Sequence, residues 1–249
     1  MPTARTPRRA SWYSVAAPAA PRPTTATSQV LTAAAYYPAM VSQDHYFTPD
    51  PTVASRPRTI RVTLPNLSFE LDTDRGVFAH GHLDFGTELL LRSLPPVPAG
   101  EVIDVGCGYG AIAITVALRN PDARVWAVDV NRRALDLCAR NAERAGALNV
   151  VPGEPEAIPD GIRFAAVYSN PPVRLGKEGL HELLLTWIGR LEPDAVATLV
   201  VQRHLGADSL AAWLTSLGHR VERVRSKGGY RVLEVHATAG TPHHERRAR

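Results

Sequence analysis

The sequence predicts an α/β fold, in which a mostly parallel, doubly wound sheet of seven strands is closed by a C-terminal antiparallel hairpin and preceded by a small N-terminal β cap. Three observations lead to this fold class. From residue 101 onward, short apolar runs alternate with segments of helical periodicity, as they do where helices join parallel strands. The first apolar run opens into a glycine-rich turn at 106–110. The chain ends in two strand-like segments around Gly228-Gly229.

The cap is predicted from the residues that precede the sheet. Apolar residues alternate in two short segments on either side of a Pro-Asn turn, which is typical of a β-hairpin. The stretch 75–82 would complete the cap, and a short apolar helix would follow and end before Pro95-Pro96. Ordered structure is expected to begin near residue 56, with the hairpin strands at 59–64 and 67–71 and the helix at 87–92.

The main sheet and its helices follow from the alternation of apolar runs. Five runs have the length of buried parallel strands, at 101–105, 124–128, 149–151, 164–169 and 195–202. Helical periodicity fills the intervals between and after them, at 109–118, 132–145, 177–191 and 207–217. The two last segments, 219–225 and 230–236, flank a two-glycine turn and predict an antiparallel hairpin rather than another crossover.

Composition divides the chain into four parts. Its 249 residues, 45% of them hydrophobic, suffice for one α/β core. Residues 1–43 are rich in Ala, Pro and Thr without periodicity, which predicts a disordered leader, or a misplaced start upstream of Met40, or less readily a transit peptide. The cap segment would then span 44–98, the main domain 99–237, and a disordered basic tail 238–249.

Charge and cysteine content limit the classes of partner. The formal net charge of +4 comes from the two ends, because residues 1–43 hold four arginines and no acid, and the tail holds three arginines and one acid. The body is therefore slightly acidic, and nucleic-acid binding would need a local patch. Two cysteines and the lack of a long apolar run or secretory segment predict a cytoplasmic protein that does not enter a membrane.

The glycine-rich turn is the first candidate site. Gly106, Gly108 and Gly110 allow the backbone to turn sharply and approach a ligand, and the following helix directs free N–H groups toward it. A tight turn without a ligand is the structural alternative. The pattern also fits a dinucleotide site, but Asp104 would repel a pyrophosphate and would suit a cationic group.

Acidic residues at the next two strand ends extend this site. Asp129 is placed to accept hydrogen bonds from both hydroxyls of a ribose. It could at the same time cap the helix that begins near Arg132. Glu154 could approach an adenine edge, or it could be a solvated loop acid.

A second candidate site follows the fourth strand of the main sheet. Asn170-Pro171-Pro172 cannot be helical before its prolines, and it places an amide and backbone carbonyls at the same sheet edge as the glycines. The amide oxygen of Asn170 and the carbonyl of Pro171 or Pro172 can accept hydrogen bonds from a planar nitrogen. Catalysis there would rest on proximity and orientation, because an Asn cannot act as a base. The alternative is a turn that the prolines stiffen and that has no role in binding.

These motifs together resemble those of class I S-adenosylmethionine-dependent methyltransferases, in the branch that methylates planar nitrogens. A longer signature resembles the "methyltransferase small domain" family, whose best-known members are ribosomal RNA guanine-N2 methyltransferases. It comprises a D-x-G-[ST]-x-L-L-L segment, an N-P-P-aliphatic-R-x-G-K run and two shorter stretches, carried here by 84–91, 170–177, His45-Tyr46-Phe47 and Val201-Gln202-Arg203-His204-Leu205. The resemblance covers about residues 45–236.

The resemblance implies a fold, a cofactor and a substrate. The fold would be the Rossmann-like class I methyltransferase fold, with 99–237 as its catalytic domain, and the cofactor S-adenosyl-L-methionine. Asp84 and Gly86 would cover the methionine end of this cofactor, and Asp104 would suit its amino group. The substrate would be the exocyclic N2 of a guanine in small-subunit (16S) rRNA. This chain departs from the pattern at Ala165, and it has no room for the degenerate duplicate half of full-length bacterial members, which leaves open how RNA is recognised.

Residues after the prolines are expected to bind the substrate. Val173 stands where DNA-adenine and protein-glutamine methyltransferases usually carry a stacking aromatic residue. Arg174 and Lys177 could hold phosphates beside the acceptor site, joined by Arg203 and His204 at a neighbouring strand end.

Basic residues also gather on the C-terminal hairpin. Strand alternation predicts that Arg223 and Arg225 share one face. There they would either contact RNA or keep a solvated edge strand from aggregating. The basic residues of the hairpin are Arg220, Arg223, Arg225, Lys227 and Arg231.

Three classes of function agree with these features. The first is an RNA guanine-N2 methyltransferase, the second a methyltransferase of a small molecule or protein amide, and the third a non-catalytic domain that binds the cofactor or RNA. The intact set Asp104, Asp129 and Asn170 argues against the third. No metal is expected, because His80-Gly81-His82 lacks the further convergent ligands that a zinc site needs.

Overall fold

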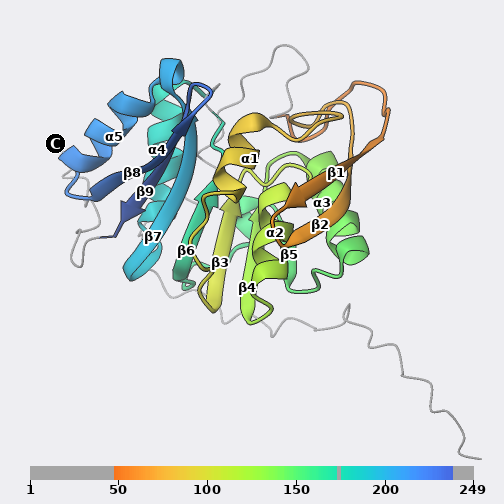
Figure 1. Ribbon diagram of the computed structural model, residues 1–249, viewed down its shortest axis with the longest axis horizontal. Helices are drawn as coiled ribbons and strands as arrows, with labels where there is room; N and C mark the ends of the chain where they lie inside the picture. The colour runs from red at the N-terminus through yellow and green to blue at the C-terminus, as the bar shows by residue number, and fades with distance from the viewer. Residues whose placement is uncertain (1–47, 173–174, 238–249) are drawn as a thin grey trace, which may run out of the picture. The chain divides into compact units, whose positions relative to one another are not determined.

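The computed structural model describes residues 48–172 and 175–237, and within them it confirms the predicted α/β fold (Figure 1). Seven strands form one sheet in the order β5-β4-β3-β6-β7-β9-β8. The five strands β3 to β7 pair in parallel, and β9 lies antiparallel between β7 and β8. The strands are β3 (Gly100–Val105), β4 (Ala123–Val128), β5 (Val150–Gly153), β6 (Phe164–Ser169), β7 (Leu191–Gln202), β8 (Arg220–Lys227) and β9 (Tyr230–His236).

Helices cover both faces of this sheet, because successive strand side chains point into two separate apolar cores. On one face the core includes Leu90, Ile114 and Leu137, from α1 (Phe85–Leu91), α2 (Ala111–Arg119) and α3 (Arg132–Ala145). On the other face it includes Leu184 and Leu214, from α4 (Gly176–Ile188) and α5 (Ala207–Ser216). No helix among the described residues is long and apolar enough to cross a membrane.

The predicted cap is an antiparallel hairpin of β1 (Arg58–Leu64) and β2 (Leu67–Thr73). Its apolar face is continuous with the first core, since Val62 and Leu71 are fully buried there. Asn141 of α3 ties the hairpin down: its amide oxygen accepts from the Asp72 N–H at 2.8 Å, and its amide nitrogen donates to the Asp72 carbonyl at 2.9 Å.

The expectation that order begins near residue 56 is wrong, because the segment 48–56 packs on α3 without forming a strand or helix. The Arg132 N–H donates to the Pro49 carbonyl at 2.9 Å, and the Arg133 guanidinium donates to the carbonyls of Pro51 and Val53. Backbone and side-chain donors at the start of α3 satisfy these carbonyls, so no local periodicity signals the segment.

Two further predictions are corrected by irregular pairing. The fourth helix of the main domain ends at Ile188 rather than 191, because Leu191 is buried on the sheet opposite Phe164 and already belongs to β7. In β8 the register shifts between Arg223 and Arg225, which pair with adjacent residues of β9. A bulge of this kind turns the two arginines to opposite faces, so the prediction that they share one face is wrong.

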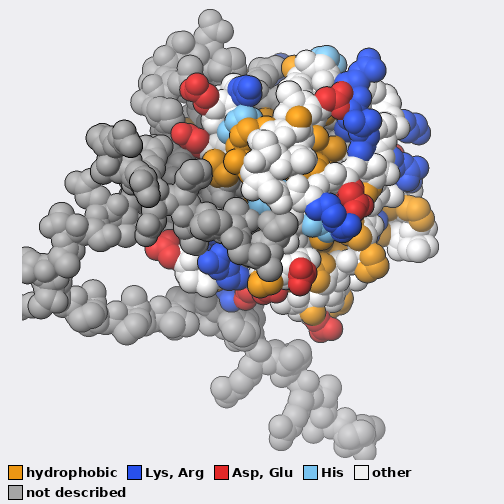
Figure 2. Space-filling model, turned by 90° about the vertical axis from the view of Figure 1, so that its left-hand side faces the viewer, with side chains coloured by type: hydrophobic (Ala, Val, Ile, Leu, Met, Phe, Trp, Pro, Cys, Tyr) orange, Lys and Arg blue, Asp and Glu red, His pale blue; other side chains and the backbone are white. Residues whose placement is uncertain are grey.

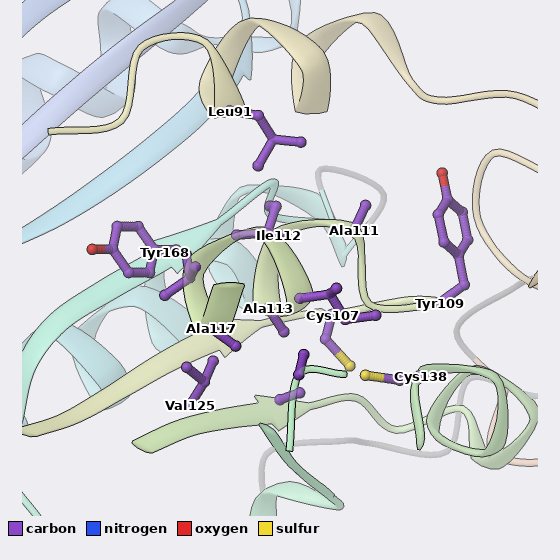
Figure 3. Packing of buried hydrophobic residues seen from close by; sticks show 14 of the residues in the cluster. Leu91, Cys107, Tyr109, Ala111, Ile112, Ala113, Ala117, Val125, Cys138 and Tyr168 are labelled. Carbon is purple, nitrogen blue, oxygen red and sulfur yellow. The ribbon is translucent and has the colours of Figure 1, made fainter. Parts of the chain in front are cut away.

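Close packing fixes the start of α2 beneath the glycine turn (Figure 3). The sulfur atoms of Cys107 and Cys138 face each other there, and both thiols are free and buried. Gly110 has a φ of 95°, and a Cβ at this position would lie 2.8 Å from the Cys138 sulfur. Burial raises the pKa of the Cys107 thiol well above its usual range and keeps it protonated.

Candidate functional site

A cavity opens at the carboxyl ends of the central strands, where open α/β sheets bind their ligands. Its walls come from the glycine turn, the ends of β4, β6 and β7, the α1 cap and the start of β9. The lining residues are Val77, Phe78, Asp84, Gly106, Gly108, Asp129, Ala134, Asn170, Pro171, Pro172, Val200, Val201, Gln202, Leu205 and Tyr230.

Asp129 fixes the conformation of the glycine turn through hydrogen bonds. Gly106 and Gly108 adopt φ values of 75° and 55°, which favour glycine. One carboxylate oxygen of Asp129 accepts from the Gly108 N–H at 2.9 Å, and the other accepts from the Asn131 N–H at 2.9 Å. Burial raises the pKa of Asp129, although these hydrogen bonds oppose the shift. Asp129 also lines the cavity.

The predicted capping of α3 by Asp129 takes a different form. Asn131 is the N-cap of this helix, and its side chain accepts from the Ala134 N–H. Asp129 accepts from the Asn131 N–H two residues further on, so both residues belong to one hydrogen-bonded corner.

Asp104 lies behind the cavity wall rather than on it. Its side chain is fully buried, and one oxygen accepts from the Ala113 N–H at 3.0 Å, within the first turn of α2. Burial raises the pKa of Asp104 to about 8, with the negative charge of Asp129 adding to the shift. The second oxygen has no partner within the described part of the chain.

Three other residues predicted to bind the cofactor do not line the cavity. Glu154 is half-buried and forms an ion pair with Arg132 at 2.9 Å. Gly110 leaves room for the Cys138 side chain, because a Cβ at this position would lie 2.8 Å from its sulfur. Gly86 provides room for another side chain, because a Cβ at this position would lie 2.5 Å from the ring of Tyr230.

The side-chain amide of Asn170 is fixed in one orientation. Its Nδ2 donates to Asp84 Oδ2 at 3.0 Å and to Thr87 Oγ1 at 2.9 Å. Asp84 is itself held as the N-cap of α1, where it accepts from the Thr87 N–H at 2.8 Å. A flipped amide would place its oxygen against the Asp84 carboxylate, so Oδ1 is directed away from both partners and remains free to accept.

The two prolines contribute unequally to the acceptor site. Both line the cavity. The Pro172 carbonyl already accepts from the Leu175 N–H at 3.1 Å, whereas no hydrogen bond of the described residues uses the Pro171 carbonyl. Within the described part of the chain, the Pro171 carbonyl is therefore the better candidate acceptor of the two.

The rim of the cavity contains residues that the sequence pattern does not single out. The Tyr230 hydroxyl accepts from Gln202 Nε2 at 2.5 Å, and its ring centroid lies 5.7 Å from that of Phe85. Phe78 and Leu205 are 37% and 47% exposed. The Val201–Leu205 stretch is part of the family resemblance. Tyr230, which contacts Gln202 of that stretch, could not be found from local sequence because only the fold of the terminal hairpin brings it to the cavity.

Two of the four predicted substrate-binding residues are among the described residues, and neither of them lines the cavity. Val173 and Arg174 fall outside the described residues. Lys177 is exposed in the first turn of α4, and Arg203 is exposed directly after β7.

The two histidines of the His80-Gly81-His82 stretch form hydrogen bonds with other parts of the protein. His80 Nε2 contacts the Arg56 carbonyl at 2.8 Å, and the His82 carbonyl accepts from the Tyr109 hydroxyl at 3.2 Å. Another ligand-type group, Glu222, Glu234 and His236, converges on the terminal hairpin. The Arg220 guanidinium already contacts Glu222 and His236 there, so the chain supplies its own cation.

The sheet order, the antiparallel last strand and a cavity over a glycine turn define the Rossmann-like methyltransferase class. The "Methyltransferase small domain" family model matches residues 68–234. A relative in Bacillus subtilis, the uncharacterized protein YbxB, is 33% identical over 196 residues, which are 77% of this chain and 98% of that protein. The chain belongs to the methyltransferase small domain family.

Named relatives and solved structures share only part of the chain. Ribosomal RNA small subunit methyltransferase C of Hahella chejuensis is 38% identical over 55% of this chain and 42% of its own length. The chain thus spans less than half of that protein. The T. thermophilus 16S rRNA N2 methyltransferase, solved with AdoMet and guanosine, has a TM-score of 0.64 at 24% identity over 75% of this chain and 52% of its own. At this identity the likeness shows the fold.

Proposed function

We propose that this protein is an S-adenosylmethionine-dependent N-methyltransferase that modifies the exocyclic N2 of a guanine in 16S rRNA, in the cytoplasm. Membership of the family establishes a methyltransferase with S-adenosyl-L-methionine as its cofactor. The RNA substrate and its N2 atom are the finer part of the proposal. They are supported by relatives whose names describe small-subunit rRNA methylation and N2 specificity.

The residues of the glycine turn fit the proposed cofactor. Asp129 would accept from the ribose hydroxyls, and the turn at Gly106 and Gly108 would lie against the adenosine and methionine parts. The unpartnered, buried oxygen of Asp104 would accept from the methionine amino group. When bound, the cofactor supplies an electrophilic methyl group.

The Asn-Pro-Pro wall would receive the methyl acceptor. Asn170 Oδ1 and the Pro171 carbonyl would accept hydrogen bonds from the two N–H groups of an exocyclic amine. Holding both hydrogens fixes the plane of the nitrogen and therefore the direction of its lone pair. Since an amide cannot remove a proton at neutral pH, the residue contributes orientation rather than base catalysis.

The observation that carries the proposal is the fixed amide of Asn170. Two acceptors hold its nitrogen, at 3.0 and 2.9 Å, so the oxygen remains for a donor in the cavity. The preferred ligand is therefore a hydrogen-bond donor such as an amine. A ligand that offers only acceptors would leave Oδ1 unpaired in a partly buried site, at a cost of about 1–3 kcal/mol.

The test is methyl transfer from labelled S-adenosylmethionine to unmodified 16S transcript and to small subunits assembled from it. Wild-type protein and Asn170→Ala would be compared, followed by nuclease digestion and mass spectrometry of the nucleosides. N2-methylguanosine formed by the wild type and lost in the variant supports the proposal. Label that enters only ribosomal protein or a small molecule would overturn the rRNA assignment.

A further inference from the structure

The tip of the terminal hairpin forms part of the cavity rim. Its turn, Gly228-Gly229, has φ values of 57° and 81°, and a Cβ on Gly228 would lie 2.5 Å from the Phe85 ring. The Arg203 N–H donates to the Gly229 carbonyl at 2.7 Å. Tyr230, the next residue, lines the cavity. These contacts therefore fix the hairpin tip at the opening of the cavity.

The bulge in β8 sorts the basic residues of the hairpin between the two faces of the sheet. Before the bulge, Arg223 pairs with Leu233 and forms an ion pair with Asp208 of α5 at 3.1 Å. After it, Arg225 pairs with Val232 and Lys227 pairs with Tyr230. Because cross-strand partners share a face, Arg225 and Lys227 lie on the face of the cavity.

Ion pairs separate the same residues into two groups. Arg223 and Arg231 both pair with Asp208, and Arg220 pairs with Glu222. Among the described residues, no carboxylate is paired with Arg203, Arg225 or Lys227, and all three are exposed. Figure 2, which looks onto the end of the molecule with α5, β8 and β9, shows Lys and Arg side chains gathered along one margin.

We propose that Arg203, Arg225 and Lys227 form a phosphate-binding rim that holds the backbone of single-stranded RNA while one base enters the cavity. This inference rests on the proposed function. Arg225 and Lys227 stand about 7 Å apart along β8, comparable with successive phosphates of an extended strand. Phe78 and Leu205, which line the cavity and are partly exposed, offer apolar surface that suits neighbouring bases.

An RNA strand fits these observations better than an acidic protein segment. Cationic side chains beside exposed aromatic and aliphatic surface are the combination that binds single-stranded nucleic acid. The body of the chain is otherwise slightly acidic, so attraction would be confined to this rim.

The experiment measures binding of a fluorescein-labelled single-stranded RNA oligonucleotide to the full chain over a series of salt concentrations. Single variants Arg203→Ala, Arg225→Ala and Lys227→Ala, and the triple variant, would be compared with Arg223→Ala. The last removes a charge from the same strand, on the opposite face. Calorimetric binding of S-adenosylmethionine checks that each variant is folded.

Each rim variant should weaken RNA binding about 3- to 10-fold and lower the slope of log K against log [salt] by about 0.7, with a loss near 2 for the triple variant. Arg223→Ala should leave both unchanged. Equal loss in Arg223→Ala, or competition by an acidic peptide as effective as unlabelled RNA, overturns the rim. If the slopes change as expected but no RNA is methylated, the rim stands and the proposed function fails. If rRNA is methylated while the slopes do not change, the proposed function stands and the rim is refuted.

Discussion

Replacing Thr87 by Val tests whether the orientation of Asn170 contributes to catalysis. Thr87 Oγ1 is one of two acceptors that hold the Asn170 amide, at 2.9 Å. Thr87 is 6% exposed, and Val has nearly the same shape, so the variant removes the acceptor without opening a cavity. Asp84 remains as the second acceptor, and the N-cap of α1 is preserved.

The expected magnitude follows from one lost hydrogen bond between neutral groups. Such a bond contributes about 0.5–1.5 kcal/mol, so methyl transfer at saturating cofactor and RNA should slow about 2- to 10-fold. The affinity for S-adenosylmethionine should not change, because Thr87 does not line the cavity. Thr115→Val, which removes a fully buried hydroxyl of α2 bonded to a backbone carbonyl, is the matched control and should keep the parental rate.

A double-mutant cycle separates orientation from general destabilisation. If Thr87 acts only through Asn170, then Thr87→Val should cause no further loss of rate in the Asn170→Ala background. Asn170→Ala alone should slow single-turnover methylation about 100-fold or more, with cofactor affinity nearly intact. An equal loss from Thr87→Val in both backgrounds would refute the reasoning.

Three further outcomes are expected. Asp129→Ala should weaken S-adenosylmethionine binding by about 2–3 kcal/mol in calorimetry, because it removes the ribose acceptor and frees the Gly108 N–H; unchanged affinity in a folded variant would contradict this. Lys177→Ala should raise the KM for rRNA about 3- to 10-fold at unchanged kcat and reduce its salt dependence, whereas a lower kcat would indicate another role. Because the pKa of Asp104 is about 8 in the folded protein and near 4 in the unfolded chain, its contribution to stability is full below pH 4 and is lost as the pH rises toward 8. Between pH 5.5 and 7.5 the unfolding free energy of the wild type should therefore fall by about 1.4 kcal/mol per pH unit relative to that of Asp104→Asn. Urea titrations that show the same pH dependence for both proteins would contradict this.

The parts of the site at strand ends can be predicted from the sequence. The carboxyl ends of parallel strands share one edge of the sheet, so the strand pattern alone predicts Asp129 and Asn170 beside the glycine turn. Both residues line the cavity wall. The position of Asp104 has a signal too, because it shares strand parity with Val102, which faces α2 and α3.

The remaining parts depend on tertiary pairing that no local pattern encodes. Asn170 meets Asp84 across 86 positions of sequence, and Gln202 meets Tyr230 across 28. The bulge in β8 shifts the parity of the residues after it, and alternation alone therefore misplaces Arg225 relative to Arg223. Ion pairing with Asp208, which decides which arginines keep their charge available, also comes from another element.

The segment that begins α1 makes contacts in addition to the one that the resemblance implies. The resemblance assigns Asp84 and Gly86 to the cover over the methionine end of the cofactor. Asp84 does line the cavity, but its contacts are with the N-cap of α1 and with the amide of Asn170. Gly86 meets the ring of Tyr230.

The short helix α1 thus contacts both Asn170 and the tip of the terminal hairpin. Its N-cap and first turn hold Asn170 through Asp84 and Thr87, and its outer face supports the hairpin tip through Phe85. An RNA backbone that docks on the proposed rim would lie beside the hairpin tip that this helix contacts. We therefore expect a substitution in the first turn of α1, such as Thr87→Val, to alter methyl transfer before it alters cofactor binding.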